Sequence, residues 1–182
     1  MTLPELLTTM AILAFVLSGI MAMFIGGFRS EVDMNQRFVN QQNARLALTS
    51  MRKEIRGSCS ESVGAAPGEA SGSLVTLGVS CTDGVPASYA TWCVDSQGKT
   101  APYTLYRQDG SNCNFATGNA RVDSLACSGA TVSCPTPVFT AVVVTGQRPQ
   151  LQVWLPVQSN LSNNHGLYTL TDTITLRNAG VS

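Results

Sequence analysis

Residues 1–28 read MTLPELLTTM AILAFVLSGI MAMFIGGF, and this segment decides the fold of the chain. From Leu6 to Phe28 no residue is charged. At a rise of roughly 1.5 Å per residue, a helix of this length spans about 35 Å, which is enough to cross the hydrocarbon core of a bilayer. Glu5 precedes the run, and a carboxylate in hydrocarbon is costly unless it meets a counter-charge or stays near the headgroups. The segment therefore predicts a membrane-compatible helix in which Glu5 has a specific role.

Two ordinary interpretations of such a segment are a secretory signal peptide and a plain membrane anchor. A signal peptide begins with a basic region and has an apolar core of about 7–15 residues. Residues 1–5 contain no Lys or Arg, and the apolar run is longer than that core. The signal-peptide interpretation is therefore disfavoured. A permanent anchor stays open, because length and hydropathy alone do not separate it from a helix that later leaves the membrane.

Met1-Thr2-Leu3-Pro4-Glu5-Leu6-Leu7 resembles the mature N-terminus of the type IV pilin and pseudopilin family. In that family a prepilin peptidase removes a basic leader, the new first residue is N-methylated, and an acidic residue occupies the fifth position. The resemblance implies that the leader has been removed and that Met1 is the methylated residue. It also implies that Glu5 neutralises the Met1 amine of a neighbouring subunit, so Met1 and Glu5 are the candidate assembly residues.

The segment departs from the family pattern in two respects. The commonest first residue in the family is Phe, and here it is Met1. Many family members have a Pro near the middle of the span, whereas this chain has Gly19 and the pair Gly26-Gly27. Glycine weakens an exposed helix by about 1 kcal/mol relative to Ala, but small residues also permit close packing of helices. We expect these glycines to serve helix packing, with local melting near Gly19 as the alternative.

A helical pattern continues past the first basic residue, Arg29. Apolar residues recur at intervals of three and four and form one face, which contains Ala44, Ala47, Leu48, Met51 and Ile55. We expect the helix to end near Arg56, because Gly57 is a suitable C-terminal stop. Arg52 and Lys53 add further cations to the last turns, where they suit the helix dipole.

Arg45, Arg52 and Arg56 could share one face of this helix and form a basic stripe for nucleic acid. The composition gives that interpretation little support, because 11 Lys and Arg balance 11 Asp and Glu. Charged residues opposite an apolar stripe are usually solvated or paired. We therefore expect structural roles for these arginines, with nucleic-acid binding as a weakly supported alternative.

The sequence changes character after Gly57. Runs rich in β-branched and aromatic residues predict strands at residues 73–79, 88–94, 103–107, 138–145, 150–156 and 168–176. Turn signals such as Asp83-Gly84 separate these runs, and short turns favour antiparallel pairing. Between residues 108 and 136 the pattern fades, and we expect an irregular, disulfide-stapled surface loop there.

The predicted fold class is therefore α+β. A long N-terminal helix carries a C-terminal antiparallel β-sheet head, in a lollipop-like arrangement that the family resemblance also implies. Residues 1–28 form the apolar helix for membrane insertion and the filament core. Residues 29–57 form its amphipathic continuation, and residues 58–182 form the disulfide-containing head.

All six cysteines lie in the predicted head, at Cys59, Cys81, Cys93, Cys113, Cys127 and Cys134. An even number confined to one exported segment predicts a framework of intramolecular disulfides. Zinc is the competing interpretation, but no C-x-x-C pair occurs and His165 is the only histidine. Cys127 with Cys134 is the most local pairing, and Cys81 with Cys93 could bridge adjacent strands, which would leave Cys59 with Cys113. Many other pairings are possible for six cysteines.

The sequence contains none of the common phosphate-binding, dinucleotide-binding, zinc-protease or nucleophile-elbow motifs. His165 in a polar turn is more typical of a solvent-facing residue than of a catalytic one. Trp92 and Trp154 lie in strand-like runs, so core packing is favoured over stacking on bases. Asn160-Leu161-Ser162 is a glycosylation candidate where suitable machinery exists. We expect no enzymatic activity, no metal and no cofactor.

These patterns, with the resemblance, predict a structural subunit of an extracellular type IV pilus filament. The head would be displayed for adhesion, motility or DNA uptake. Only 12% of residues are charged where about 25% is usual, which favours burial against other subunits. The implied partners are copies of the chain or other pilins, the prepilin peptidase and a membrane assembly platform, with an inner-membrane pool before assembly. The alternatives are a pseudopilin of a type II secretion system and a membrane-anchored extracellular binding domain.

Overall fold

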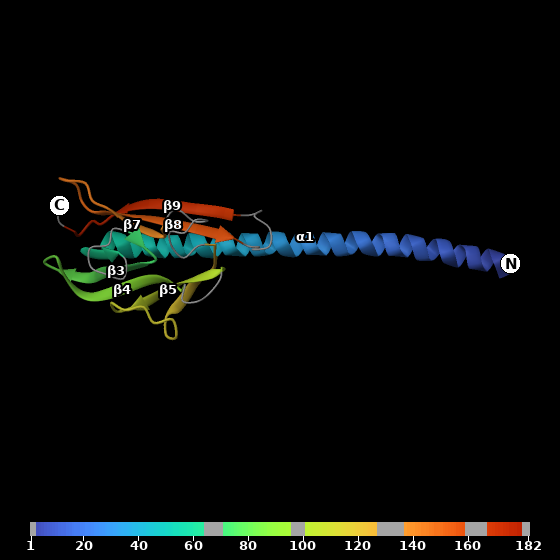
Figure 1. Ribbon diagram of the computed structural model, residues 1–182, viewed down its shortest axis with the longest axis horizontal. Helices are drawn as coiled ribbons and strands as arrows, with labels where there is room; N and C mark the ends of the chain where they lie inside the picture. The colour runs from blue at the N-terminus through green and yellow to red at the C-terminus, as the bar shows by residue number, and fades with distance from the viewer. Residues whose placement is uncertain (1–2, 64–70, 96–100, 127–136, 159–166, 180–182) are drawn as a thin grey trace. The chain divides into compact units, whose positions relative to one another are not determined.

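The computed structural model describes residues 3–63, 71–95, 101–126, 137–158 and 167–179. Contacts between residues divide the chain into two units, residues 1–38 and residues 39–182, and each is described by itself. Helix α1 (Leu3–Gly57) supplies the described residues of the first unit and the first element of the second (Figure 1).

Helix α1 has no interruption at Gly19 or at Gly26, so the glycines are compatible with regular helix. In the second unit the predicted apolar face is confirmed, since the buried residues of α1 are Ala44, Ala47, Leu48, Met51 and Ile55. Burying a large apolar side chain stabilises the folded state by about 1.5–3 kcal/mol. This face therefore holds the sheet against the helix.

Hydrogen bonds to the last carbonyl groups fix the end of α1. Ser58 donates from its backbone N and from Oγ to Ile55 O, at 3.2 and 2.6 Å. Asn178 Nδ2, near the C-terminus of the chain, donates to Gly57 O at 2.8 Å. Gly57 does not adopt a left-handed φ. The predicted end of the helix is confirmed, but capping side chains terminate it rather than the conformational freedom of glycine.

Nine strands in the described residues form one antiparallel sheet. They are β1 (Ser60–Val63), β2 (Ser71–Gly72), β3 (Leu74–Thr82), β4 (Val85–Asp95), β5 (Tyr103–Asp109), β6 (Asn119–Leu125), β7 (Phe139–Val142), β8 (Gln150–Gln158) and β9 (Leu167–Thr175). The strand order is β1-β3-β4-β5-β6-β8-β7-β2, and β9 also pairs with β8. In Figure 1, β3 to β5 lie on one side of the second part of α1 and β7 to β9 on the other. The α+β fold class is therefore confirmed.

Each strand predicted from sequence is present, with small shifts at its ends. The turn at Asp83-Gly84 is confirmed by left-handed φ angles of 53° and 80°. The prediction of an irregular loop between residues 108 and 136 is wrong in part, because strand β6 lies within that segment. Two register shifts against β5 interrupt the alternation of β6, which hides its strand pattern. The short strands β1 and β2 also have no signal in the sequence.

Two disulfides staple the described part of the second unit. Cys59 bonds to Cys81 with 6.2 Å between the Cα atoms, and Cys93 bonds to Cys113 with 6.3 Å. Both distances suit a disulfide. The predicted framework is therefore confirmed for four cysteines, and the proposed third pair, Cys127 with Cys134, lies outside the described residues.

The predicted pairing of Cys81 with Cys93 is wrong, and so is the pairing of Cys59 with Cys113. The register of β3 and β4 places Cys81 opposite Pro86 but Cys93 opposite Leu74. At about 3.4 Å per residue, these positions lie roughly 24 Å apart along the ladder. Cys81 instead lies near Cys59, which follows the end of α1.

The core of the second unit forms between α1 and the inner face of the sheet. Trp92 is fully buried in it, which confirms the predicted packing role of this residue. Trp154 is only half-buried, because it alternates with the buried residues Val153 and Leu155 along β8. The sheet therefore has one face on the core and one face toward solvent.

Candidate assembly surface

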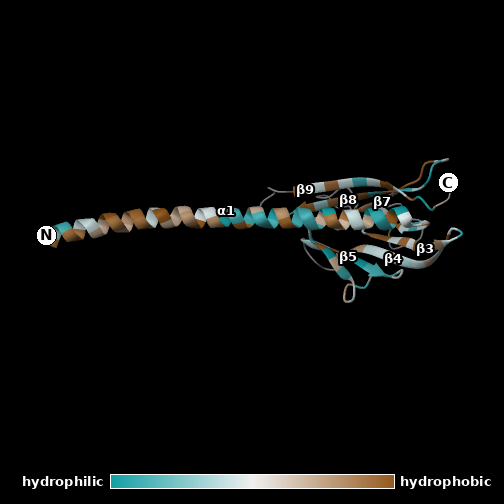
Figure 2. Cartoon of the chain, turned by 180° about the vertical axis from the view of Figure 1, so that it is seen from behind, coloured by the Kyte–Doolittle hydropathy of each residue, from teal (hydrophilic) through white to brown (hydrophobic). Residues whose placement is uncertain are grey.

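The first part of α1 exposes an apolar surface, which we call the assembly surface and define as residues 3–28. Every Leu, Ile, Val, Met and Phe in this range is exposed, with fractions as high as 80% for Phe15 and 82% for Met23. Figure 2 shows this part of the helix mainly in the brown of hydrophobic residues. Soluble monomers rarely expose apolar patches larger than a few hundred Å². The surface therefore requires lipid or another apolar surface.

By length and composition, α1 can cross a membrane, and its most apolar window has a mean hydropathy of 2.3. None of that window is buried in the structure. Charge returns at Arg29, and further along the first unit Asp33 Oδ2 and Arg37 Nη2 form an ion pair at 2.7 Å. The apolar surface thus ends at a charged segment, as expected for a helix that leaves the hydrocarbon there.

Three hydroxyl groups on the assembly surface donate hydrogen bonds within the helix. Thr8 Oγ1 donates to Glu5 O at 3.0 Å, Thr9 Oγ1 to Leu6 O at 2.9 Å, and Ser18 Oγ to Phe15 O at 2.9 Å. In hydrocarbon or at a dry helix contact, a polar group without a partner is costly. These hydroxyls therefore allow the surface to be buried without leaving donors unsatisfied.

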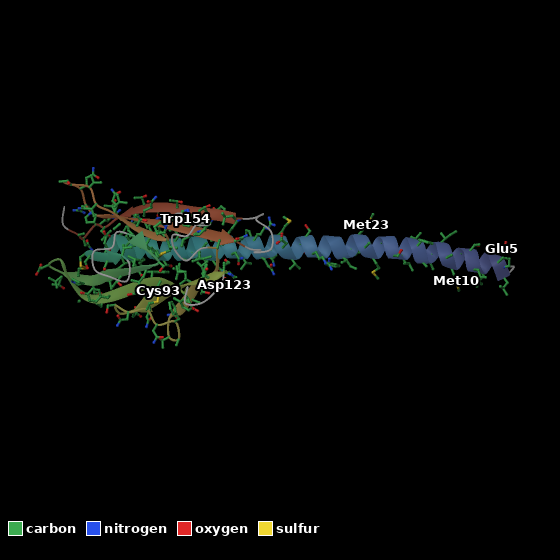
Figure 3. All side chains as sticks on the ribbon, in the orientation of Figure 1. Glu5, Met10, Met23, Cys93, Asp123 and Trp154 are labelled. Carbon is green, nitrogen blue, oxygen red and sulfur yellow. A yellow bond between two sulfur atoms is a disulfide. The ribbon has the colours of Figure 1, made fainter. Side chains whose placement is uncertain are left out.

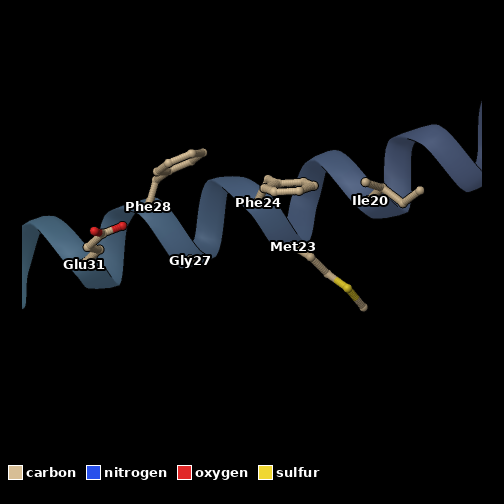
Figure 4. A pocket seen from close by; sticks show the side chains of 6 residues that line it. All are labelled: Ile20, Met23, Phe24, Gly27, Phe28 and Glu31. Carbon is tan, nitrogen blue, oxygen red and sulfur yellow. The ribbon is translucent and has the colours of Figure 1, made fainter.

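A shallow groove of about 570 Å³ lies on the assembly surface beside Gly27. Figure 4 shows Phe24 and Phe28 projecting above the helix there, with Ile20 further along and Met23 on the other side. The ring centroids of Phe24 and Phe28 are 6.4 Å apart. A Cβ atom added to Gly27 would meet nothing within 4 Å, so the space beside it is open. Small residues of this kind let another helix approach closely.

Glu5 lies in the first turn of α1 (Figure 3). A carboxylate in this position interacts favourably with the positive end of the helix dipole. Met1 lies outside the described residues, so its expected pairing with Glu5 of another copy stays a prediction. The structure thus places Glu5 at the start of an exposed apolar surface.

Two of the three arginines of the possible basic stripe, Arg45 and Arg52, contact the sheet in the second unit. Arg45 Nη2 donates to Tyr168 Oη at 3.1 Å, and its guanidinium lies 5.8 Å from the centre of that ring. Arg52 pairs with Asp172, with distances of 2.9 Å from Nε and 2.8 Å from Nη2 to Oδ2. Both partners belong to β9. Arg45 and Arg52 therefore fasten β9 to α1, in agreement with the structural role expected for them.

These partners could not be predicted from local sequence patterns, because Tyr168 and Asp172 lie more than a hundred residues away from Arg45 and Arg52 along the chain. Within β9, Tyr168 and Asp172 alternate with exposed residues and lie on the same side of the strand as the buried Ile174. This alternation indicates that both side chains face α1. Within the described ranges, no group of three or more His, Cys, Asp or Glu residues could hold a metal ion. His165 lies outside them.

Comparisons of the chain with protein-family models, with curated proteins and with solved structures find no match.

Proposed function

We propose that the chain is a non-enzymatic structural subunit of an extracellular type IV pilus filament, polymerising through α1. The assembly surface is the observation that supports this proposal, because its apolar side chains are exposed throughout residues 3–28 of a membrane-compatible helix. Lipid can cover this surface before assembly, and the same surface of other copies can cover it in a filament. The second unit then supplies the exposed part of each subunit.

Two features favour a helix that leaves the membrane over a permanent anchor. Glu5 lies in the first turn of α1, where a cationic group of another copy could pair with it, and the groove beside Gly27 leaves space for a side chain of another helix. The N-terminal resemblance to type IV pilins implies a partner for Glu5, the Met1 amine of a neighbouring copy. A pseudopilin of a secretion system shares these features and is the second candidate function.

Imaging of sheared surface filaments, with identification of their peptides, tests the proposal. We expect long filaments that contain peptides from residues 39–182. Recovery of the chain only from the membrane fraction contradicts filament assembly. Absence of long surface filaments, with the chain in a secretion complex, favours the pseudopilin.

A photo-crosslinking amino acid at Phe24 separates the anchor from the filament subunit. In filaments we expect covalent adducts between copies, because Phe24 borders the groove. A permanent anchor gives lipid adducts instead. The matched control is the same amino acid at Tyr89, an exposed aromatic position on β4, which should give no adduct between assembly surfaces.

A further inference from the structure

A second groove lies in the seam between α1 and the sheet, entirely within residues 39–182. Its volume is about 560 Å³, which lies in the usual range for sites that hold small molecules. Helix α1 contributes Lys53 and Glu54, β5 contributes Arg107, and β6 contributes Arg121. Three cations and one carboxylate therefore border the same space.

The single carboxylate of this seam groove is already engaged. Glu54 Oε2 accepts a hydrogen bond from Trp92 Nε1 at 2.7 Å, and Glu54 Oε1 accepts one from Arg107 Nε at 3.1 Å. Arg107 also forms an ion pair with Asp109. In the part of the chain that the structure describes, no hydrogen bond or ion pair engages the side chain of Lys53 or of Arg121. The positive charge of these two residues is left for a ligand.

An irregularity in β6 places Arg121 at the groove. Val122 lies opposite Leu105, and Ala120 lies opposite Tyr106, so Arg121 is an extra residue between adjacent positions of β5. A β-bulge of this kind redirects a side chain relative to regular alternation. Arg121 consequently borders the same groove as Arg107 of the neighbouring strand.

The β3 wall of the seam groove also has an unusual backbone. Ser80 has a φ of 56°, in the left-handed region that residues other than glycine rarely adopt. Such conformations persist where the surroundings hold them, and they concentrate at ligand sites. The next residue, Cys81, is bonded to Cys59, which follows the end of α1, so the disulfide links this wall to the segment that leaves the helix.

We propose that the seam groove binds a small polyhydroxylated oxyanion, such as a sugar carboxylate or a sugar phosphate. The guanidinium of Arg121 and the ammonium of Lys53 hold the anionic group, because charge-assisted hydrogen bonds are the stronger kind. The hydroxyls of Ser50 and Ser80, which also border the groove, are available to the ligand hydroxyls. This site gives the second unit a ligand of its own and does not depend on filament assembly.

Calorimetric titration of the full chain, dispersed in a neutral detergent, tests the site. Glucuronate and glucose 6-phosphate supply the carboxylate and phosphate forms of the oxyanion, and glucose supplies the neutral comparison. We expect saturable binding of at least one anion, no binding of glucose at the same concentration, and weaker binding as NaCl is raised. The preferred anion identifies which oxyanion the site takes.

The variants Arg121→Gln and Lys53→Gln should each weaken anion binding about tenfold, because each removes a charged donor. Arg29→Gln is the matched control, since it removes one exposed positive charge from the first unit. Circular dichroism verifies that each variant keeps its fold. The proposal is overturned by absence of saturable binding of both anions, by equal binding of glucose, or by an equal loss in the control. Dispersed subunits suffice for the assay, so its result is separate from that of the filament experiments.

Discussion

Glu54 connects three elements of the second unit through one carboxylate. Its two oxygens accept hydrogen bonds from Trp92 on β4 and from Arg107 on β5, while its backbone belongs to α1. The register of β4 and β5 places Trp92 directly opposite Arg107, which brings both donors to one carboxylate. Because Trp92 is fully buried, its indole N–H has no access to water as a substitute. The carboxylate therefore stabilises the packing of the helix on the sheet.

We expect Glu54→Ala to lower the free energy of unfolding by about 2–4 kcal/mol, because it leaves a buried N–H and a half-buried guanidinium without their acceptor. Glu54→Gln should lose less, since its amide oxygen still accepts one bond. Urea unfolding in neutral detergent, followed by tryptophan fluorescence, measures both. Glu31→Ala, an exposed acidic position in the first unit, is the control. A Glu54→Ala midpoint equal to that of the control would contradict the role of the carboxylate.

Glu61 is a second carboxylate, and its partly buried surroundings disfavour the charged form. It lies on β1 opposite the buried Leu77, so it faces the inner side of the sheet. Its Oε2 is buried and has no hydrogen-bond partner in the described residues. Burial raises the pKa of Glu61 from 4.5 to about 7. The folded chain therefore binds this proton more tightly than the unfolded chain does, and stability falls as the pH rises from about 4.5 to about 7.

Glu61→Gln should remove this decline, because it replaces the titrating group with a neutral one of the same shape. Above pH 7 the variant should be more stable than the parent by on the order of 1 kcal/mol, since partial exposure of the side chain screens much of the effect. Urea unfolding at pH 5 and pH 8 gives the comparison. If the parent and the variant show the same dependence on pH, Glu61 does not titrate in this range.

Local sequence patterns predict some of the helices and strands but not others. The buried face of α1 follows from the spacing of its apolar residues, and β3 and β4 follow from runs rich in β-branched and aromatic residues on either side of Asp83-Gly84. Strand β6 could not be predicted, because the register shifts at Arg121 and before Leu125 break its alternation. The same limit applies to polar contacts and disulfides, since these depend on which strands are neighbours and in what register. The spacing of residues along the sequence specifies neither which strands are neighbours nor their register.

The two disulfides that link elements of the second unit can be tested directly. Mass mapping without reduction should recover peptides that join Cys59 to Cys81 and Cys93 to Cys113. A peptide that joins Cys81 to Cys93 would contradict the register of β3 and β4. Because the bonds close loops of 22 and 20 residues, replacing either pair with serine should lower the free energy of unfolding by about 3 kcal/mol in the chain-entropy model. Urea unfolding of the two double variants measures this loss.

At the scale of the whole molecule, the two units differ in the exposure of their apolar side chains. The first unit leaves them exposed along the assembly surface, and the second buries them between α1 and the sheet. The assembly surface could be predicted from sequence, because a long uncharged run is a local pattern. The contacts that cover it could not, since they would form with lipid or with other copies of the chain. Experiments on assembly must therefore be made with the whole chain.

Glu5→Val is the decisive variant for the proposed filament. The substitution removes the only charged side chain before Arg29, so the helix stays at least as compatible with the membrane. In the proposed filament Glu5 pairs with the Met1 amine of a neighbouring copy, and breaking a buried pair costs about 3–5 kcal/mol. We expect stable protein that accumulates in the membrane with few or no filaments. Immunoblots of membrane and sheared fractions, with electron microscopy, measure both quantities.

Two further variants show whether charge itself is required. Glu5→Gln keeps the size and polarity of the side chain but removes its charge, so it should fail to assemble as Glu5→Val does. Thr9→Val is the matched control, because the Thr9 hydroxyl donates only within the helix and its loss should leave assembly unchanged. Filaments of normal abundance from Glu5→Val, expressed alone at the parental level, would show that no ion pair at this position drives assembly. If other subunits form the bulk of the filament, the same comparison applies to incorporation of this chain, since those subunits can polymerise without it.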